Sequence, residues 1–310
     1  MNRADNQQVP ISEPRRALDA LGVRAARVTV LKDVPSENGS WLVERPGGRR
    51  EVLRRYHGQA TEEDLAYEHE VLRHLAEAGW VVPAPVSGLA RCDGLWYCLT
   101  MFVPGRPVTQ EGSAQQWRRG ADLARLHLAL RGLGDQIGQR PGWLAQHQSV
   151  TVHSSLDWRA CVHGLSEASP RLAEWAEAAA EQSRAALAAV GAENLPVIVV
   201  HGDFAPWNVH YQSDRLAGVI DFGLTHLDSR PYELAIARTH RAPQVTEAYR
   251  SELASSQWPL TDLEEAAVLP VYHAFRLDQA AWRLSDSMRT GRYDLPAIER
   301  QLSRTATPPP

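Results

Sequence analysis

The stretch Val197–His226 reads VIVVHGDFAPWNVHYQSDRLAGVIDFGLTH. It places His201, Asp203 and Asn208 in the spacing H-x-D-x-x-x-x-N, and Asp221 follows thirteen residues after Asn208. Phosphoryl transfer needs a carboxylate that orients and deprotonates the acceptor hydroxyl, together with oxygen ligands for Mg²⁺ on the nucleotide phosphates. Asp203 fits the first role, and Asn208 and Asp221 fit the second. An Asx-rich turn between core strands is the alternative, but it does not account for the joint spacing.

Short apolar runs flank these polar residues and predict strands. They are Val197–Val200, Val209–Gln212 and Leu216–Ile220, and a three-residue turn joins the last two into a hairpin. Because a hairpin returns along itself, we expect Asp221 to lie beside the loop at which the hairpin begins. The two carboxylates and the amide are therefore expected to converge.

The pattern of the chain changes near residues 102–107. Before that point, strand-like runs and one helix predict a β-rich part, and after it long amphipathic runs predict helices. The expected strands are Arg27–Lys32, Trp41–Glu44, Glu51–Tyr56, Val86–Leu89 and Trp96–Phe102. The expected helices are Thr61–Ala78, Gln115–Arg131, Pro170–Ala189 and Asp262–Arg289.

Two domains are predicted from this change, residues 1–103 and residues 104–310. The polar residues 1–13 are expected to be loosely ordered, and the Pro-rich residues 305–310 to be disordered. Ligands favour clefts between domains, so the boundary is where we expect the substrates to bind.

Composition excludes several classes of protein. The net charge of −4 argues against nucleic acid as a partner, because nucleic-acid binding usually needs a basic face. No window approaches eighteen consecutive apolar residues, and the N-terminus lacks the apolar stretch of a secretion signal. We therefore expect a cytoplasmic protein without a membrane partner. The cysteines, Cys92, Cys98 and Cys161, are odd in number and lack zinc spacing, which argues against a disulfide framework or a structural metal.

The residues HGDFAPWN followed by IDFG resemble the catalytic hairpin of the aminoglycoside phosphotransferase and choline kinase group. That group shares the architecture of the eukaryotic protein kinases, and the resemblance covers roughly residues 25–295. It implies an α+β, bilobal, protein-kinase-like fold, with a small β-rich N-lobe and a larger, mostly helical C-lobe. It also implies a kinase of small molecules that uses Mg²⁺ and ATP or GTP, and the sequence does not choose between the two nucleotides.

The resemblance assigns roles to single residues of the hairpin. Asp203 is then the catalytic base, Asn208 and Asp221 are the metal ligands, and His201 supports the loop. Glu233, in the run PYELA, resembles the acid that steadies the catalytic loop from a following helix. A surface carboxylate at the start of a helix is the alternative for Glu233.

A basic residue in the first domain is expected to anchor the nucleotide phosphates. The run Val52–Tyr56 reads VLRRY, where Arg54 and Arg55 must face opposite sides of a strand. The family pattern favours Arg54 in the place of the usual lysine, and arginine still bridges phosphate oxygens. Its expected partner is Glu68 on the following helix. Solvated surface charge is the alternative for both, and the sequence alone does not decide between Arg54 and Arg55.

Further nucleotide contacts are predicted around these strands. The turn at residues 35–40 contains one glycine and no G-x-G-x-x-G, and its backbone and Ser40 are candidates for contact with phosphate. A plain strand turn explains it equally well. Thr100, Met101 and Val103 resemble the hinge whose backbone pairs with the nucleotide base.

The acceptor class follows from what comes after the hairpin. Only Leu224–Arg230 separates DFG from PYELA, and no A-P-E follows, although protein kinases use a long segment ending in A-P-E to hold a peptide. This favours a compact acceptor, and we expect a natural product that is an antibiotic, with phosphorylation conferring resistance. A metabolite such as homoserine or choline is the alternative, followed by a protein Ser/Thr kinase.

Candidate acceptor residues come from two kinds of side chain. Aromatic rings stack on ring-bearing acceptors, and carboxylates bind amines. The aromatic candidates are Trp207 inside the catalytic loop, Trp143, Trp158 and Trp282. The acidic candidates are Asp157, Glu167, Asp228 and Asp278, with scattered surface acids as the alternative. The sequence predicts neither the phosphorylated hydroxyl nor the oligomeric state.

Overall fold

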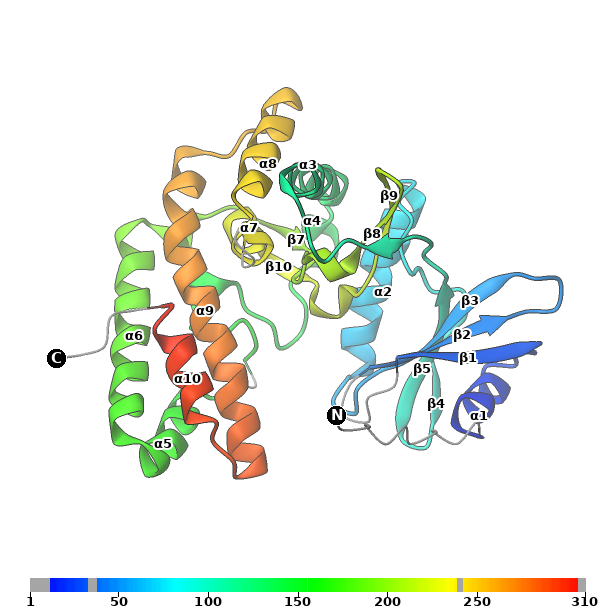
Figure 1. The fold of residues 1–310 in the computed structure, drawn as a ribbon, viewed down its shortest axis with the longest axis horizontal. Helices are drawn as coiled ribbons and strands as arrows, with labels where there is room; N and C mark the ends of the chain where they lie inside the picture. Colours follow the sequence, from blue (N-terminus) through cyan, green and yellow to red (C-terminus); the bar gives the residue numbers. More distant parts are fainter. Residues whose placement is uncertain (1–11, 33–37, 155, 239–241, 306–310) are drawn as a thin grey trace. The chain divides into compact units, whose positions relative to one another are not determined.

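The computed structural model describes residues 12–32, 38–154, 156–238 and 242–305. The chain forms two compact units (Figure 1). The first comprises residues 1–106 and 210–221, and the second comprises residues 107–209 and 222–310. The predicted domain boundary between residues 103 and 104 stays a prediction, and the compact units differ from it chiefly by joining residues 210–221 to the first unit.

The first unit is built on a five-stranded antiparallel sheet in the order β1-β2-β3-β5-β4. Buried and half-buried residues alternate along β2, so one face of the sheet is buried. The strands are β1 (Arg27–Lys32), β2 (Gly39–Glu44), β3 (Arg50–Arg55), β4 (Ala90–Cys92) and β5 (Leu95–Met101). The helices are α1 (Ser12–Ala20) and α2 (Glu62–Glu77).

A cap starts one helix of this unit, and apolar burial holds the other. The Thr61 side chain accepts from the backbone of Asp64, whose carboxylate accepts in return, so a capping box starts α2 as expected. Helix α1 buries Ala17 and Leu18 against the sheet, next to Trp41. Ser12 and Glu13 therefore belong to a helix, whereas residues 1–11 of the predicted loose segment lie outside the described residues.

One predicted strand is wrong. Residues 86–89 form no strand, and only Pro85 makes an isolated bridge, to Thr100. Proline lacks an N–H, and the Val86 and Ser87 N–H groups both donate to the Leu99 carbonyl, so no regular ladder forms. The strand that pairs with β5 is β4, a few residues later.

A hairpin returns to the first unit from the second. Strands β8 (Val209–Gln212) and β9 (Arg215–Val219) pair with each other and with β6 (Arg106–Pro107). The Val219 N–H donates to the Val81 carbonyl, and a side chain at Gly218 would clash with that same carbonyl. This close approach fixes the end of the hairpin, where Asp221 follows.

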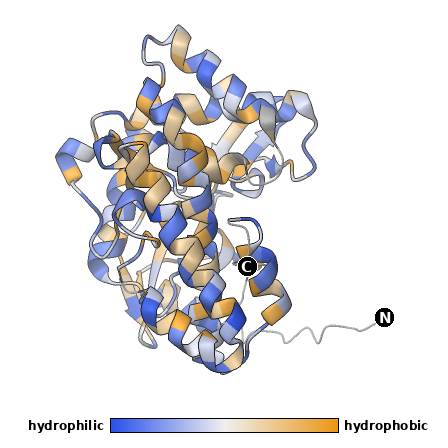
Figure 2. Ribbon diagram, turned by 90° about the vertical axis from the view of Figure 1, so that its left-hand side faces the viewer, coloured by the Kyte–Doolittle hydropathy of each residue, from blue (hydrophilic) through white to orange (hydrophobic). Residues whose placement is uncertain are grey.

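The second unit is mostly helical. Apolar and polar residues alternate along its helices, as expected for helices with one buried face (Figure 2). The helices are α3 (Ser113–Leu130), α4 (Gly134–Ile137), α5 (Trp158–Ala168), α6 (Pro170–Ala189), α7 (Arg230–Arg238), α8 (Pro243–Ser255), α9 (Asp262–Thr290) and α10 (Leu295–Leu302). A two-stranded sheet pairs β7 (Val197–Val200) with β10 (His226–Ser229).

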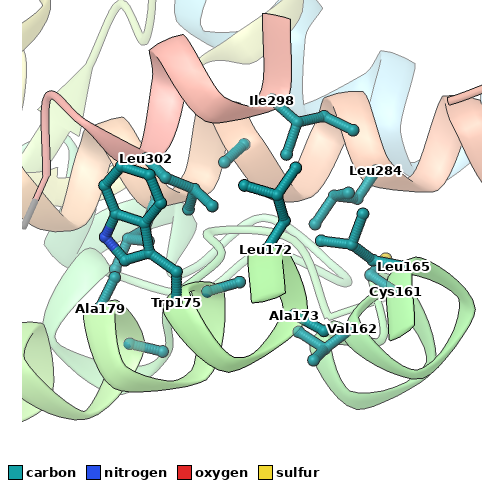
Figure 3. Close-up of a cluster of buried hydrophobic side chains, with 14 of the residues drawn as sticks. Cys161, Val162, Leu165, Leu172, Ala173, Trp175, Ala179, Leu284, Ile298 and Leu302 are labelled. Carbon is teal, nitrogen blue, oxygen red and sulfur yellow. The ribbon is translucent and has the colours of Figure 1, made fainter. Parts of the chain in front are cut away.

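Two buried clusters hold α9 in place. One cluster packs α5, α6, α9 and α10 together, with Leu165, Leu172, Leu284 and Ile298 at its centre (Figure 3). The other joins β7, α7 and α9. In the parts of the chain that the structure describes, no helix is long and apolar enough to cross a membrane.

Candidate active site

The loop between β7 and β8 holds the predicted catalytic residues. Asn208 Nδ2 donates to the Asp203 carboxylate at 2.8 Å and to the Asp203 carbonyl at 2.9 Å. Trp207 Nε1 also donates to that carboxylate, at 3.3 Å. Gly202 has a φ of +84°, and a Cβ there would lie 2.1 Å from the Leu224 carbonyl oxygen, so only glycine fits. The turn therefore fixes the Asp203 carboxylate together with Asn208.

Glu233 supports this loop from α7. Its side chain is fully buried and accepts from the backbone N–H of Gly202 at 2.9 Å and of Phe204 at 3.1 Å. Burial raises the pKa of Glu233, but His127, His201 and the Gly202 N–H outweigh that effect and leave the pKa below its ordinary value. The surface-carboxylate alternative for Glu233 is therefore wrong.

His201 is also buried and lies under the loop. Its Nδ1 accepts from the Asp203 N–H at 3.1 Å, and its ring lies 4.4 Å from the Phe222 ring, measured between centroids. These contacts connect the loop to the residue after Asp221 in the chain. They match the supporting position that the sequence suggested.

Arg119 is a supporting residue that the sequence analysis missed. It is fully buried in α3, where it forms an ion pair with Glu111 at 2.7 Å and donates to the Phe204 carbonyl at 3.1 Å. It also donates to the Ala237 carbonyl at 3.3 Å. Its neighbour Arg118 looks the same in sequence, so only the burial of one face of α3 distinguishes the two arginines.

The first unit contains the predicted phosphate anchor. Arg54 Nη1 lies 2.8 Å from Glu68 Oε1, and Arg54 Nη2 lies 3.2 Å from Asp221 Oδ1. Burial lowers the pKa of Arg54, but Glu68, with Tyr56 and Asp221, outweighs it and leaves the pKa raised. The expected Arg54–Glu68 pair is therefore present, and it includes Asp221, whose side chain is 50% exposed.

Arg55 points to the other face of β3. It pairs with Glu13 of α1 at 2.8 Å and lies over the Trp41 ring. Glu13 also accepts from the Tyr97 hydroxyl at 2.7 Å. The alternation of the strand thus directs Arg54 toward Asp221 and Arg55 toward α1.

The remaining predicted nucleotide residues lie on the same sheet or next to it. Ser40 of β2 is directly opposite Arg54 in the strand register. Thr100 is buried and donates to the Val52 carbonyl, while the Met101 N–H donates to the Ala84 carbonyl. Val103 is buried. Contact of these residues with a nucleotide stays a prediction, and residues 35–37 of the predicted phosphate turn lie outside the described residues.

Asn208 and Asp221 each offer an oxygen atom of the kind that Mg²⁺ binds. Asn208 uses its Nδ2 for both bonds to Asp203, so its Oδ1 remains as the donor atom. Asp221 supplies a half-exposed carboxylate with a left-handed φ of +64°. Mg²⁺ commonly takes one or two such protein oxygens and completes its shell with phosphate and water. Asp221 belongs to the first unit and Asn208 to the second.

The second unit contains a cavity of about 760 Å³ next to the loop. Asp203 and Gly202 form part of its wall, and helix α9 forms another part. Six aromatic side chains line it, namely Trp143, Trp207, Tyr232, Tyr272, Phe275 and Trp282. A volume of this size matches sites for drug-sized molecules.

The cavity includes some of the predicted acceptor residues and excludes others. Trp207, Trp282, Trp143 and Asp278 line it. The remaining candidates, Asp157, Trp158, Glu167 and Asp228, are not among its lining residues, and acceptor binding by any of the candidates stays a prediction.

Each excluded residue has another environment. Asp157 caps α5 by accepting from the Ala160 N–H, and Trp158 packs against the α5–α6 core. Glu167 is exposed on α5. Asp228 is buried and accepts from the Gln146 N–H at 2.8 Å.

Asp278 is the buried carboxylate of the cavity. Burial raises its pKa to about 7, although the Val152 N–H, at 3.2 Å, acts in the opposite direction. The nearby charge of Asp228 raises the pKa further. Asp278 therefore differs from Asp203, which lies at the cavity wall with two donors from its own loop.

Sequence comparison identifies curated relatives. Homoserine kinase from Caulobacter vibrioides (strain NA1000 / CB15N) is 30% identical over 206 residues, covering 64% of this chain and 61% of the relative. Homoserine kinase from Granulibacter bethesdensis is 28% identical over 274 residues, covering 82% of this chain and 79% of the relative. The chain thus spans about three fifths of the length of the first of these relatives.

Solved structures share the fold at low identity. An amicoumacin kinase in complex with AMP-PNP, Ca²⁺ and Ami superposes with a TM-score of 0.68 at 16% identity, covering 98% of this chain and 92% of the other. The GDP complex of aminoglycoside 2'-phosphotransferase-IIIa gives a TM-score of 0.64 at 15% identity, covering 96% and 100%. These similarities confirm the α+β, kinase-like fold class. Residues 31–269 match the phosphotransferase enzyme family, and the chain belongs to that family.

Proposed function

We propose that the protein transfers the γ-phosphate of ATP or GTP to a hydroxyl of a small natural product, and that this acceptor is an antibiotic. One observation carries the proposal. The Asp203 carboxylate, held by Asn208 and Trp207, forms part of the wall of an aromatic cavity of about 760 Å³. A carboxylate in that place is within reach of the hydroxyl of a bound acceptor.

Asp203 has the role of orienting the acceptor hydroxyl and taking its proton as the oxygen attacks phosphorus. Asn208 and Trp207 both donate to Oδ2, which fixes the plane of the carboxylate. Glu233 and Arg119 hold the backbone of the loop, so the carboxylate does not have to reorganise during the reaction.

Asn208 and Asp221 would hold the Mg²⁺ that binds with the nucleotide. When bound, the ion neutralises charge on the phosphate oxygens. Arg54 would contact the phosphates, since Glu68 and Asp221 fix its guanidinium near the C-terminal end of β3. Ser40 would join it from the neighbouring strand, and the backbone of Thr100–Val103 would pair with the base.

The cavity supports a ring-bearing acceptor over a polycationic one. Its aromatic residues offer surfaces on which rings stack. Two acids, Asp203 and Asp278, and two arginines, Arg276 and Arg304, lie among its lining residues. Because the carboxylates do not outnumber the arginines, the cavity has no excess of negative charge to bind several amines.

Homoserine is the second candidate acceptor. The curated relatives carry the name homoserine kinase, and one of them is matched over 79% of its length. The size of the cavity favours a larger molecule, whereas the sequence relationship favours this amino acid. A peptide acceptor has less support, because the residues after Asp221 form a short turn, then β10, and then α7 directly.

A transfer assay tests the proposal. The purified protein is mixed with Mg-ATP or Mg-GTP and with homoserine, choline and antibiotics of the nucleoside, peptide, macrolide and aminoglycoside types. Phosphorylated product is identified by mass spectrometry and ³¹P NMR. Transfer to an antibiotic, its loss in Asp203→Asn, and protection of a sensitive bacterium that expresses the protein would support the proposal. Transfer to homoserine at low KM without any protection would favour the metabolite kinase instead.

A further inference from the structure

Arg276 is a buried cation at the wall of the cavity. It lies on α9, is 7% exposed, and donates from Nη2 to Gln301 Oε1 of α10 at 2.5 Å. Its Nε is buried without a hydrogen-bond partner. Among the described residues, no carboxylate lies within 4 Å of the guanidinium nitrogens of Arg276 or of Arg304, which lines the same cavity.

Other buried arginines of the chain have the partner that Arg276 lacks. Arg54 pairs with Glu68, Arg119 with Glu111, and Arg230 with Glu264. A buried charge without a counterion loses its hydration and gains little in return, so such an arrangement is costly. Arg276 differs in this respect from these three arginines, and also from the buried Arg140, which donates to the backbone carbonyls of Gly223 and Thr225.

The surroundings of Arg276 add to this cost. Burial lowers the pKa of its guanidinium, Tyr272 acts in the opposite direction, and the positive charge of Arg304 lowers the pKa further. The side chain is nevertheless held in position, because the buried residues Leu284, Ile298 and Leu302 pack α9 against α10 (Figure 3). Arg276 and Arg304 thus bring two neighbouring cations to the wall of the cavity, and among the described residues no carboxylate pairs with either of them.

We propose that the acceptor carries a carboxylate besides its hydroxyl, and that Arg276, with Arg304, binds this carboxylate. This inference rests on the proposed function, since it concerns the acceptor of the same site. A planar guanidinium matches a carboxylate with parallel N–H···O bonds, and Arg276 lines the cavity without a carboxylate of the described chain to occupy its guanidinium. Arg276 is then a specificity-determining residue.

A carboxylate fits this place better than a phosphate. Asp278 lies two residues away on α9 and lines the same cavity, and it is a second source of negative charge when ionised. A doubly charged phosphate would be repelled by it more strongly than a singly charged carboxylate. A hydroxy acid has one negative charge to pair with Arg276 and Arg304, and it is repelled by Asp278 less than a phosphate would be.

Binding to the full-length protein without nucleotide provides the test, with two pairs of probes. Indole-3-acetate and indole-3-acetamide have nearly the same shape, but only the first has a carboxylate. Homoserine and 3-aminopropan-1-ol differ in that only homoserine has a carboxylate. Affinity is measured by calorimetry. We expect at least one of the carboxylates to bind roughly tenfold tighter than its partner, or more, since hydrogen bonds between ions are strong.

Two variants locate the effect. Arg276→Gln removes the charge and keeps a hydrogen-bonding side chain, so the carboxylate preference should fall to near one. Arg289→Gln, an exposed position near the end of the same helix, should keep the full preference. Circular dichroism verifies that both variants fold, and the comparison of probes on the wild-type protein stands even if Arg276→Gln does not fold.

Three results would overturn the inference. They are equal affinity of charged and uncharged probes for the wild-type protein, a preference that persists in Arg276→Gln, and displacement of the carboxylates by inorganic phosphate at lower concentration. The proposed function fails separately. If the carboxylate preference depends on Arg276 but no acceptor is phosphorylated, the protein binds hydroxy acids without being their kinase.

Discussion

In the catalytic loop, Glu233 accepts from two backbone N–H groups, and the buried Arg119 lies against Glu111 and a loop carbonyl. At the part of the cavity wall that α9 forms, Arg276 has no carboxylate partner within the described chain, and Asp278 has no cationic partner there. The two regions border the same cavity, and both bury charged groups. They differ in how fully the described residues supply partners of opposite charge and hydrogen bonds for the buried charged groups.

The difference separates groups that position a reaction from groups that recognise a molecule. A completed network is set before any substrate arrives, so it preorganises the loop and adds to folding stability. An incomplete one lowers folding stability, and a ligand of the right charge restores the loss when it binds. Mutations should therefore have opposite effects on stability in the two regions.

The largest effect is expected at the carboxylate that both regions share. Asp203→Asn keeps the shape of the side chain but removes the proton acceptor, so we expect kcat to fall by roughly 10² to 10⁴. Nucleotide affinity and the melting temperature should stay close to wild type, because Asp203 lies at the surface of the cavity. Steady-state kinetics and nucleotide binding by calorimetry measure both. Near-normal kcat would remove Asp203 from the role of base.

Arg54 and its neighbour Arg55 provide a matched test of the predicted nucleotide phosphate contact. Arg54→Ala leaves Glu68 buried without its partner, and breaking such a pair costs about 3–5 kcal/mol of folding free energy. Arg55→Ala also removes a buried ion pair, the one with Glu13, but on the face away from Asp221. Both variants should therefore be less stable, and only Arg54→Ala should also lose nucleotide affinity.

Arg54→Lys serves as a control that keeps the positive charge but lacks the planar guanidinium with its paired N–H donors. It should recover part of the nucleotide affinity, because lysine still contacts phosphate as a point charge. Equal losses of affinity in the Arg54→Ala and Arg55→Ala variants would show that stability, and not a phosphate contact, explains the result. Urea titration and nucleotide calorimetry separate the two quantities.

Asp278 should make the free energy of unfolding depend on pH. Its pKa is about 7 in the folded protein, above the ordinary 3.8, so the folded state holds the proton more tightly than the unfolded state. The free energy of unfolding should therefore fall as pH rises from about 4 to about 7. Asp278→Asn removes this dependence and should be more stable than wild type above pH 7, by up to about 4 kcal/mol.

The comparison at pH 4 is the internal control, since wild type and Asp278→Asn should then differ little. Urea denaturation at several pH values provides the measurement. A variant that is less stable than wild type at pH 8 would mean that Asp278 belongs to a completed network like that of the loop.

The sequence predicted the catalytic loop well because its parts are local. Asp203 and Asn208 are five residues apart, and the flanking strands Val197–Val200 and Val209–Gln212 have the predicted bounds. Turn residues and β-branched runs act within a few residues, so one sequence is sufficient to reveal them. The functional roles of these residues stay predictions.

Some helices of the second unit were harder to predict. Two that the sequence analysis missed, α8 and α10, have proline within their first two residues. Proline is common in the first turn of a helix, but it also interrupts helices, so in the sequence it indicates the start or the end of a helix equally well. The cavity also combines residues from Trp143 to Arg304, and the exclusion of Asp157 and Asp228 depends on packing that no local pattern carries.

The smallest effect is expected for the completed network, at Glu233. Glu233→Gln keeps one oxygen to accept from Gly202 or Phe204 but turns an amide N–H toward the other donor, which costs about 1–3 kcal/mol. The loop should become less ordered, so we expect kcat to fall about tenfold while KM for the nucleotide changes little. Glu247→Gln, an exposed position on α8, is the matched control and should leave both quantities unchanged.

The pH dependence of this variant distinguishes the loop from the cavity wall. The pKa of Glu233 is lowered in the folded state, so its contribution to stability is present above about pH 4.5 and is lost as pH falls through the folded pKa. The stability difference between wild type and Glu233→Gln should therefore shrink on acidification, whereas the difference for Asp278→Asn grows as pH rises toward 7. If Arg276→Gln destabilised the protein as much as Glu233→Gln does, Arg276 would be part of the framework, and the distinction between the two regions would be wrong.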